Sequence, residues 1–297
     1  MQQLSDDDKI LTHVFKPLYH VNQKIKVYDL KKLLDGGRKI LFKPHRISFF
    51  AIVLVLQGQG KHIIDFQEIS IKTGDILLIF PGQIHQYTVP ENLKCTVIAF
   101  EEDIFINYKS TISLKDSYSI LDELILKNFI SVSESVMQIL SGIAAAIELE
   151  TRHQLDQNQT PLLQSMLSII LYTIHREMYI NEPNDAGFHD KRIALSFKKL
   201  VCDSLNVQNT VDFYLKKLNI SKATLLKATR STFDRSPKSL IQDILILEAK
   251  RLLSQANKQI KDVAYELGFT EPTNFTKFFK KYTFLTPEAF RENVFRM

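Results

Sequence analysis

Cationic side chains in the last hundred residues recur at helical spacing. In one predicted helix Lys222, Lys227 and Arg230 share a face, opposite the apolar Leu225 and Ala228. A second predicted helix repeats the pattern, with a cationic face of Lys277, Lys280 and Lys281 and an apolar face of Phe275, Phe279 and Tyr282. Such a helix fits the major groove of DNA, with its first turns against base edges and its later cations against phosphates. The pattern therefore predicts recognition of double-stranded DNA.

Each of these two helices, which we call the reader helices, follows the same short unit. The apolar residues of that unit are spaced i, i+3, i+4 and i+7, and the spacing returns 49 residues later: Val211, Tyr214, Leu215 and Leu218, then Ile260, Val263, Ala264 and Leu267. Asn219 and Gly268 tolerate the left-handed backbone that ends a helix, and Ser221 or Thr270 can cap the next helix. The sequence thus predicts two helix-turn-helix units.

The segment between the two units, residues 238–255, has the pattern of one helix of 18 residues. At 1.5 Å per residue it is about 27 Å long, near the ~34 Å that separates successive major-groove faces. A stiff spacer of this length would present both reader helices to one side of a duplex. Ordinary packing of a helical hairpin would explain a single copy of the unit more simply, but two copies in a basic segment favour DNA binding.

Positive charge is concentrated in the C-terminal part of the chain. Residues 191–297 contain 20 Lys and Arg against 10 Asp and Glu, a net charge of +10, whereas residues 1–190 contain 18 against 23, a net charge of −5. A concentrated positive field attracts phosphate backbones because it releases their condensed counterions, whereas a merely soluble helical surface usually mixes both signs. The charge distribution therefore favours nucleic acid as the partner of the C-terminal part.

The C-terminal segment resembles the AraC/XylS family of transcription regulators over residues 195–291. The string IKDVAYELGFTEPTNFTKFFKKYTFLTPEAFR, residues 260–291, is similar to the signature of that family. The resemblance implies base contacts from Ala223, Leu226 and Lys227 in the first unit, and from Pro272, Thr273, Thr276 and Lys277 in the second. It implies phosphate contacts from Lys222, Arg230, Lys280 and Lys281.

The chain departs from the family pattern at three positions. Asp234 and Phe284 replace the glycine that usually precedes the Ser/Thr-Pro pair of each unit, and Leu245 replaces an arginine of the linker helix. Asp tolerates a left-handed turn, but Phe at positive φ is strained, so we expect the turn at Phe284 to be differently shaped or held by packing. Because Ala223 and Leu226 offer only apolar contact, for example to thymine methyls, we hypothesise that the second unit supplies more of the hydrogen-bonded readout.

The first hundred residues contain short runs rich in Ile, Val and Phe that are separated by glycines. These runs predict strands at 47–57, 62–67, 69–72, 75–80 and 95–100, spaced as in a small antiparallel barrel or sandwich. The segments FKPHRISFFAIVLVLQGQGKHIIDF (42–66) and TGDILLIFPGQIHQY (73–87) resemble the cupin-like sensory domain that precedes the DNA-binding domain in many family members.

A barrel of this size either fills its interior with side chains or holds one small ligand, so we expect an effector pocket here. The candidate inward-pointing residues are His45, Arg46, Phe50, Gln83, His85 and Tyr87. Arg46 would suit an anionic or polyhydroxylated ligand, although a surface ion pair explains it equally well. The phase of a strand cannot be read from a run as uniformly apolar as FFAIVLVL.

The segment around His85 approximates the second motif of the cupins. Metal-using cupins also need a first motif with two histidines one residue apart and a glutamate nearby, and His62 has no histidine two residues further on. We therefore expect His45, His62 and His85 to hydrogen-bond a ligand or the core rather than a metal ion, and we expect no cofactor. No nucleophile-elbow, zinc-protease, P-loop or dinucleotide motif occurs, which argues against an enzyme.

Helical patterns replace strand patterns after about residue 117, at 118–127, 133–155 and 161–179. The last two helices have apolar stripes of Val136, Ile139, Leu140, Ile143, Ala144 and Ile147, and of Leu163, Met166, Leu167, Ile170, Leu171 and Ile174. By the resemblance these stripes would form a homodimer interface, and packing against their own barrel is the alternative.

The predicted fold is α+β with two domains, a cupin-like antiparallel β-barrel with a helical pair and an all-α double helix-turn-helix joined by a linker helix. The barrel that binds the effector would span residues 1–117, and the helical pair for dimerisation 118–180. The polar, turn-rich residues 181–190 would link them to a DNA-binding domain at 191–297.

The composition, 45% hydrophobic and 24% charged over 297 residues, is that of a globular protein with room for two cores. Two cysteines, an acidic N-terminus and no apolar run longer than eight residues predict a cytoplasmic protein without membrane contact. We predict a transcription regulator, controlled by a small-molecule effector, that binds promoter DNA as a homodimer and contacts RNA polymerase if it is an activator. The alternatives are a constitutive DNA-binding regulator whose barrel only dimerises, and a cupin enzyme with a C-terminal interaction module.

Overall fold

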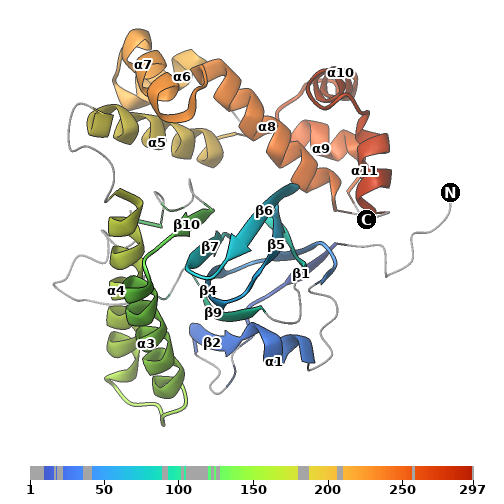
Figure 1. Ribbon diagram of the computed structural model, residues 1–297. Helices are drawn as coiled ribbons and strands as arrows, with labels where there is room; N and C mark the ends of the chain where they lie inside the picture. Colours follow the sequence, from blue (N-terminus) through green and yellow to red (C-terminus); the bar gives the residue numbers. More distant parts are fainter. Residues whose placement is uncertain are drawn as a thin grey trace. The chain divides into compact units, whose positions relative to one another are not determined.

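The computed structural model describes residues 10–16, 18, 23–35, 42–88, 93–101, 104, 120–121, 124, 128–179, 187–205, 210–255 and 258–295. The chain forms two compact units, one over Leu11–Asn181 and one that includes Glu182–Met297. Figure 1 colours the first unit from blue to yellow-green and the second from yellow to red. Among the described residues, no helix combines the length and the apolar character needed to cross a membrane.

The described strands of the first unit form two five-stranded sheets. In the first sheet the order is β1 (Leu11–His13), β3 (His45–Ile47), β8 (Ile84–Thr88), β5 (Gln59–Ile64) and β6 (Gln67–Lys72). In the second sheet the order is β10 (Phe129–Ser131), β7 (Asp75–Ile79), β4 (Phe50–Gln57), β9 (Lys94–Phe100) and β2 (Ile25–Asp29). The α+β class is confirmed, but the sheets do not close into the expected barrel. The pairing is also not all antiparallel, because β1 runs parallel to β3.

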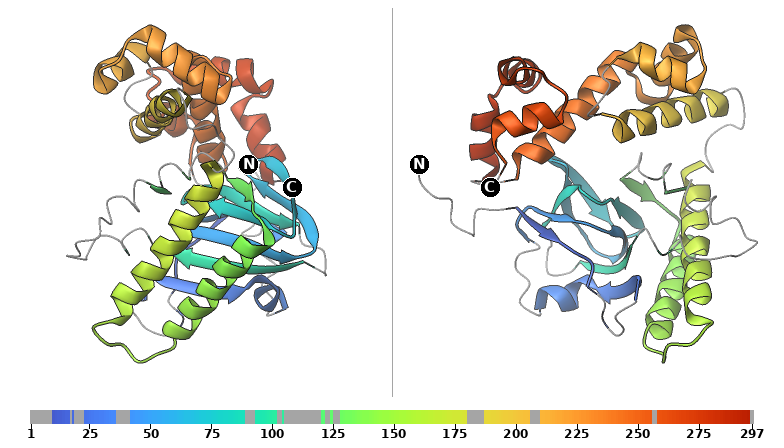
Figure 2. Two further views of the ribbon diagram at one scale, coloured as in Figure 1. Left: turned by 60° about the vertical axis from the view of Figure 1, so that its left-hand side comes forward. Right: turned by 180° about the vertical axis from the view of Figure 1, so that it is seen from behind.

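Strand β4 is apolar from Phe50 to Leu56 because both faces of its sheet are buried over most of its length. Its residues 50, 52 and 54 pack with the helices α3 (Glu134–Glu150) and α4 (Gln159–Tyr179), and residues 51, 53 and 55 pack against the other sheet. Figure 2, left, shows the two helices side by side in front of the sheet. The first unit is therefore a three-layer structure of helices, inner sheet and outer sheet.

Tight turns set the register of the outer sheet. Asp65 and Phe66 have φ values of 48° and 70°, which makes the two-residue hairpin turn between β5 and β6. The Asp65 carboxylate accepts hydrogen bonds from the Gln83 side chain at 3.0 Å and from the Ile84 backbone N–H at 3.2 Å. A bend at residues 48–49 divides the predicted strand 47–57 between β3 and β4.

Helices α3 and α4 form close to their predicted positions, but most of their apolar stripes belong to the core of their own unit. The buried residues are Leu140, Ala144, Ile147, Leu163, Leu167, Ile170, Leu171 and Ile174, and Val136, Ile143 and Met166 pack against them. Ile139, in contrast, is 53% exposed. Most residues of the two stripes therefore pack against their own unit, which was the alternative to a dimer interface, because they fill the core between the inner sheet and the helices. The predicted helix 118–127 falls largely outside the described residues.

The second unit is helical. Its helices are α5 (Gly187–Asp203), α6 (Val211–Leu218), α7 (Lys222–Phe233), α8 (Pro237–Leu253), α9 (Ile260–Glu266), α10 (Pro272–Thr283) and α11 (Pro287–Phe295). Helix α5 packs against α6, α7 and α8, and α8 also packs against α9, α10 and α11. Because α5 begins at Gly187, the last four residues of the predicted linker are helical.

Candidate nucleic-acid interface

The first reader helix is α7, and its sequence divides it into a buried and an open face. Ser221 caps it, because the Thr224 N–H donates to the Ser221 hydroxyl at 3.1 Å. Leu225 and Ala228 are fully buried. The predicted DNA-contacting residues Lys222, Ala223, Lys227 and Arg230 are exposed, and Leu226 is half-buried.

The second reader helix, α10, has the same division. Phe275 and Phe279 are fully buried. The predicted contacts Thr273, Lys277, Lys280 and Lys281 are exposed, and Pro272 and Thr276 are half-buried. Two expectations were wrong here. Tyr282 is 36% exposed rather than part of the core, and Thr270 does not cap the helix, because the additional residue Glu271 occupies the N-cap position.

Helix α8 holds the two readers. Its 17 residues correspond to about 25 Å, and α7 and α10 lie at its opposite ends (Figure 1). Leu245, which replaces the family's arginine, is buried in this helix. At the far end of α8 the Arg291 guanidinium of α11 donates to the Leu253 carbonyl oxygen at 3.0 Å and so satisfies one of the terminal carbonyls. One continuous helix therefore fixes the separation of the readers.

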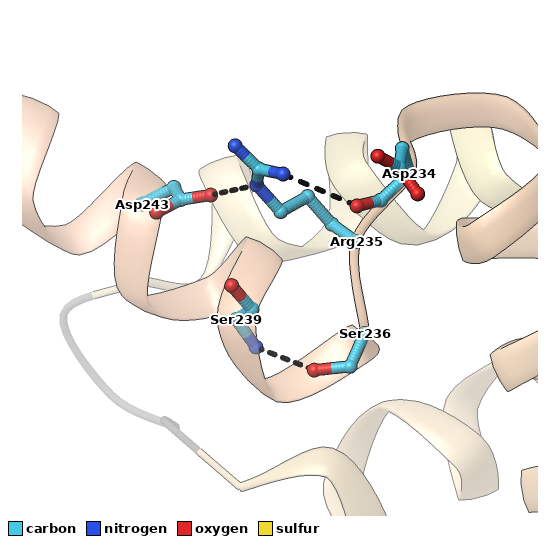
Figure 3. A network of polar contacts seen from close by, with 5 residues as sticks. All are labelled: Asp234, Arg235, Ser236, Ser239 and Asp243. Carbon is cyan, nitrogen blue, oxygen red and sulfur yellow. Dashed lines mark hydrogen bonds and ion pairs between the residues drawn. The ribbon is translucent and has the colours of Figure 1, made fainter.

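Hydrogen bonds and an exposed ion pair connect the residues of the turn after α7 (Figure 3). Asp234 adopts the left-handed conformation at φ 52°, as expected for this substitution of glycine. Arg235 then donates to the Asp243 carboxylate and to the Asp234 carbonyl oxygen, each at 3.2 Å. Ser236 caps α8 by accepting from the Ser239 N–H at 3.1 Å. These contacts connect the end of the first reader helix to the spacer.

At the turn after α10, Phe284 has the strained positive φ that the sequence predicts, but its side chain is not packed against the protein. Phe284 is left-handed at φ 62°, and its side chain is 87% exposed. The Thr283 hydroxyl donates to the Leu285 carbonyl oxygen or to the Phe279 carbonyl oxygen, at 3.1 Å and 2.8 Å. Hydrogen bonds around Thr283, rather than burial of the phenyl ring, hold this turn.

The structure adds one residue to the reader surface that the sequence did not indicate. The Lys227 ammonium lies 2.9 Å from the carboxylate of Asp190, a residue of α5. Asp190 is 37 positions away and falls in the segment that was expected to be a linker, so no local pattern connects it with α7. Only the packing of α5 on α7 brings the two charges together.

In the first unit, histidines gather between the two sheets. The ring centroids of His45 and His85 are 4.1 Å apart, those of His62 and His85 5.4 Å, and those of His62 and Tyr87 4.4 Å. All four side chains are buried, and the ring nitrogens of His62 and His85 have no hydrogen-bond partner among the described residues. Among the same residues, no three His, Cys, Asp or Glu side chains are arranged to hold a metal ion.

Burial determines the protonation of this histidine cluster (His45, His62 and His85). Loss of hydration lowers the pKa of His45 to about 4 and that of His62 to about 3, and it places the pKa of His85 well below its usual value. Charge repulsion among the histidines acts in the same direction. Each ring is therefore neutral at pH 7, with one nitrogen that donates and one that accepts.

Three of the predicted pocket residues lie away from this cluster. Arg46 alternates with His45 along β3 and so points to the opposite face of the outer sheet. Phe50 stacks on Phe100 at 5.2 Å, on the helix side of the inner sheet. Gln83 accepts from the Phe80 N–H at 2.8 Å and donates to Asp65, which holds a turn.

A separate open groove of about 790 Å³ is lined by Gln59, Gly60, Lys61, Ser70, Ile71, Lys72, Asp75, Phe129 and Ser131.

Known protein families match a segment of each of the two units. Residues 33–172 match a family model described as an AraC-like ligand binding domain, and residues 214–293 match one described as a helix-turn-helix domain. The Msm operon regulatory protein of Streptococcus mutans is 22% identical over 85% of this chain and 87% of its own. The lactose operon transcription activator of Staphylococcus xylosus is 23% identical over 81% of this chain and 82% of its own.

Among solved structures, ToxT from Vibrio cholerae O395 aligns with 92% of this chain and 100% of its own, at 17% identity and a TM-score of 0.42. Both of these curated relatives carry the names of transcription regulators. A ligand-binding model followed by a helix-turn-helix model accounts for most of the chain, and it confirms the resemblance seen in residues 195–291. The chain belongs to the AraC/XylS family of transcription regulators.

Proposed function

We propose that this regulator contacts one stretch of promoter DNA with both reader helices at once. The observation that carries the proposal is the pair of exposed cationic faces on α7 and α10, which one spacer helix holds at its two ends. The base contacts are Ala223, Leu226, Lys227, Pro272, Thr273, Thr276 and Lys277, and the phosphate contacts are Lys222, Arg230, Lys280 and Lys281.

Selection of bound fragments from a genomic library by the full chain tests this proposal. We expect a specific sequence to be enriched and its affinity to fall steeply with salt, because phosphate contacts release counterions. Enrichment without sequence preference, at an affinity that does not respond to salt, would contradict it.

The second reader supplies more of the hydrogen-bonded readout in this proposal. Thr273, Thr276 and Lys277 present hydroxyl and ammonium groups, whereas Ala223 and Leu226 present only methyl groups. We expect the double variant T276A and K277A to relax sequence preference more than K227A does. The opposite order in a selection experiment would assign the main readout to α7.

The effector would bind between the two sheets of the first unit, at the histidine cluster and Tyr87. The free ring nitrogens of His62 and His85 support this position, because buried polar atoms normally have partners and a polar ligand would supply them. The ligand would be a small polar molecule that accepts from and donates to neutral imidazoles.

Titration of candidate metabolites against the affinity for the selected fragment tests effector control. We expect one compound to change the affinity by about 5- to 150-fold, the usual range of coupling between sites. His85→Leu should abolish that change while it leaves the affinity without metabolite nearly intact. If no metabolite changes the affinity, the constitutive alternative holds.

A second copy of the chain would pack against the outer faces of α3 and α4. Ile139 and Leu149 of α3 are exposed, and so are Ile169 and Tyr172 of α4. Gly142 lies between the first two, and a Cβ at this position would meet nothing within 4 Å, so the unit itself does not require a glycine there. These residues replace the buried stripes as the dimer interface.

Sedimentation of the full chain at micromolar concentration tests this interface. We expect a dimer for the wild type and a monomer for the double variant Ile139→Glu and Ile169→Glu. A wild-type monomer would contradict the proposal. On the promoter, the regulator would act as an activator, as the names of several relatives suggest. As an activator it would contact RNA polymerase. Transcription from the selected promoter in vitro should then rise when the protein is added.

A further inference from the structure

An ion pair links the first reader helix to a helix outside both helix-turn-helix units. The Lys227 ammonium and the Asp190 carboxylate are 2.9 Å apart, within the second unit. The lysine side chain is 70% exposed, but the aspartate side chain is only 9% exposed. The pair therefore has one anchored partner, under α7, and one partner on the surface that faces DNA in the proposed function.

The position of Asp190 in its helix suits a negative charge. It lies in the first turn of α5, where the free N–H groups of the helix stabilise a negative charge. A buried carboxylate without a partner is costly, so the separation of Lys227 from Asp190 is unfavourable. This distinguishes the pair from exposed ion pairs such as Arg235 with Asp243, which contribute little.

The pairing changes what Lys227 offers to DNA. A lysine ammonium has three N–H donors, and one bond to Asp190 leaves two for acceptors such as O6 and N7 of guanine. Its charge is already balanced, so it displaces no counterion from a phosphate when the protein binds. Arg230, on the same helix, is exposed and is expected to make an ordinary phosphate contact.

We infer that Asp190 is a positioning residue for DNA reading, which fixes the Lys227 ammonium for a base edge and prevents its use as a general phosphate contact. The inference rests on the proposed function, since it requires α7 to touch DNA. It assigns a role in sequence specificity to α5, a helix that precedes the first helix-turn-helix.

The test compares four single variants of the full chain: D190N, K227M, R230M and D203N. Asp203 is an exposed residue at the other end of α5, so D203N makes the same change in net charge away from the pair. Affinities for the selected fragment and for a random duplex of equal length are measured over a range of salt concentrations. Far-ultraviolet circular dichroism checks that each variant is folded.

We expect D190N to bind the random duplex more tightly and with a salt slope steeper by about one counterion, because Lys227 becomes a free charge. The ratio of specific to random affinity should fall by about 5- to 150-fold, the range for loss of one good base contact. D203N should change neither quantity. A D190N protein with the slope and ratio of the wild type would overturn the inference.

The lysine variant tests the same claim without a change at Asp190. K227M should weaken binding to the selected fragment and leave the salt slope on the random duplex unchanged, whereas R230M should lower that slope by about one. If K227M lowered the salt slope on the random duplex as much as R230M does, Lys227 would be a phosphate contact and the inference would be overturned. A wild type that does not prefer the selected fragment would overturn the proposed function and the inference together.

Discussion

At the scale of single residues, the interior of the first unit contains an unusual concentration of neutral histidines. Each of the three has a pKa below its ordinary value because burial removes hydration from the charged ring. In the unfolded chain the same rings take up protons near their ordinary pKa of 6.5. Folding therefore opposes protonation, and the fold is sensitive to acid in proportion to the number of buried rings.

This predicts a loss of stability between about pH 7 and about pH 5. The folded-state pKa values of His45 and His62 lie near 4 and 3, so in this window only the unfolded state gains protons. The free energy of unfolding should fall by about 2 kcal/mol for each buried histidine. Urea unfolding of the full chain, followed at several pH values, measures the effect.

The control is His62→Leu, which removes one titrating group and should reduce the dependence on pH by about a third, although it also changes the packing. A stability that is constant from pH 7 to pH 5 would mean that the rings are hydrated or protonated in the folded protein.

At the scale of elements, the two reader helices begin differently although their sequences look alike. Ser221 caps α7 with a hydrogen bond of 3.1 Å, whereas α10 begins at Pro272 without a side-chain cap. The one-residue insertion before Pro272 moves Thr270 out of the capping position. A sequence comparison aligns the two hydroxyl residues, but only the helix start shows which of them acts.

Ser221→Ala should therefore lower the free energy of unfolding of the second unit by about 1 kcal/mol, the usual cost of a lost N-cap. Thr270→Ala, its matched control, should change it by less than about 0.5 kcal/mol, as a surface substitution does. Thermal unfolding of both variants measures the difference. Equal losses would mean that Thr270 caps α10 in solution.

The turn after α10 is strained and unprotected by packing. Phe284 has φ 62° with its ring 87% exposed, so replacement by glycine removes strain and loses almost no buried surface. Phe284→Gly should raise the free energy of unfolding by about 0.5–1 kcal/mol, and Phe284→Ala should not, because alanine also disfavours positive φ. Chemical unfolding of the two variants measures this. A gain from alanine as large as that from glycine would place the cost in the ring and not in the backbone.

At the scale of the whole molecule, the sequence predicts the second unit better than the first. Apolar spacing and turn residues predict the positions of α6, α7, α9 and α10, because each helix is amphipathic and lies next to a residue typical of a helix end. The short strands β1, β2, β8 and β10 were not predicted, because three to five residues carry too little periodicity.

The candidate sites differ in the same way: the sequence predicts the DNA-facing residues of the second unit better than the interior residues of the first. The open faces of α7 and α10 follow from helical spacing within one element. The interior of the first unit depends on the phase of β3 and β4, which uniformly apolar residues do not reveal, and so Arg46 and Phe50 were misplaced. Asp190 could not be found, because its pairing with Lys227 depends on packing between helices.

In the proposed function, one spacer helix holds the two reader helices against the same duplex. Hydroxyl-radical footprinting of the full chain on its selected fragment should show two protected segments about one helical turn apart, near 10 base pairs. Insertion of about five base pairs between them rotates one segment to the opposite side of the duplex. If both readers hold the same duplex, this insertion removes protection from one segment and lowers the affinity at least tenfold. Undiminished binding with both segments protected would mean that the two helices do not read the duplex together.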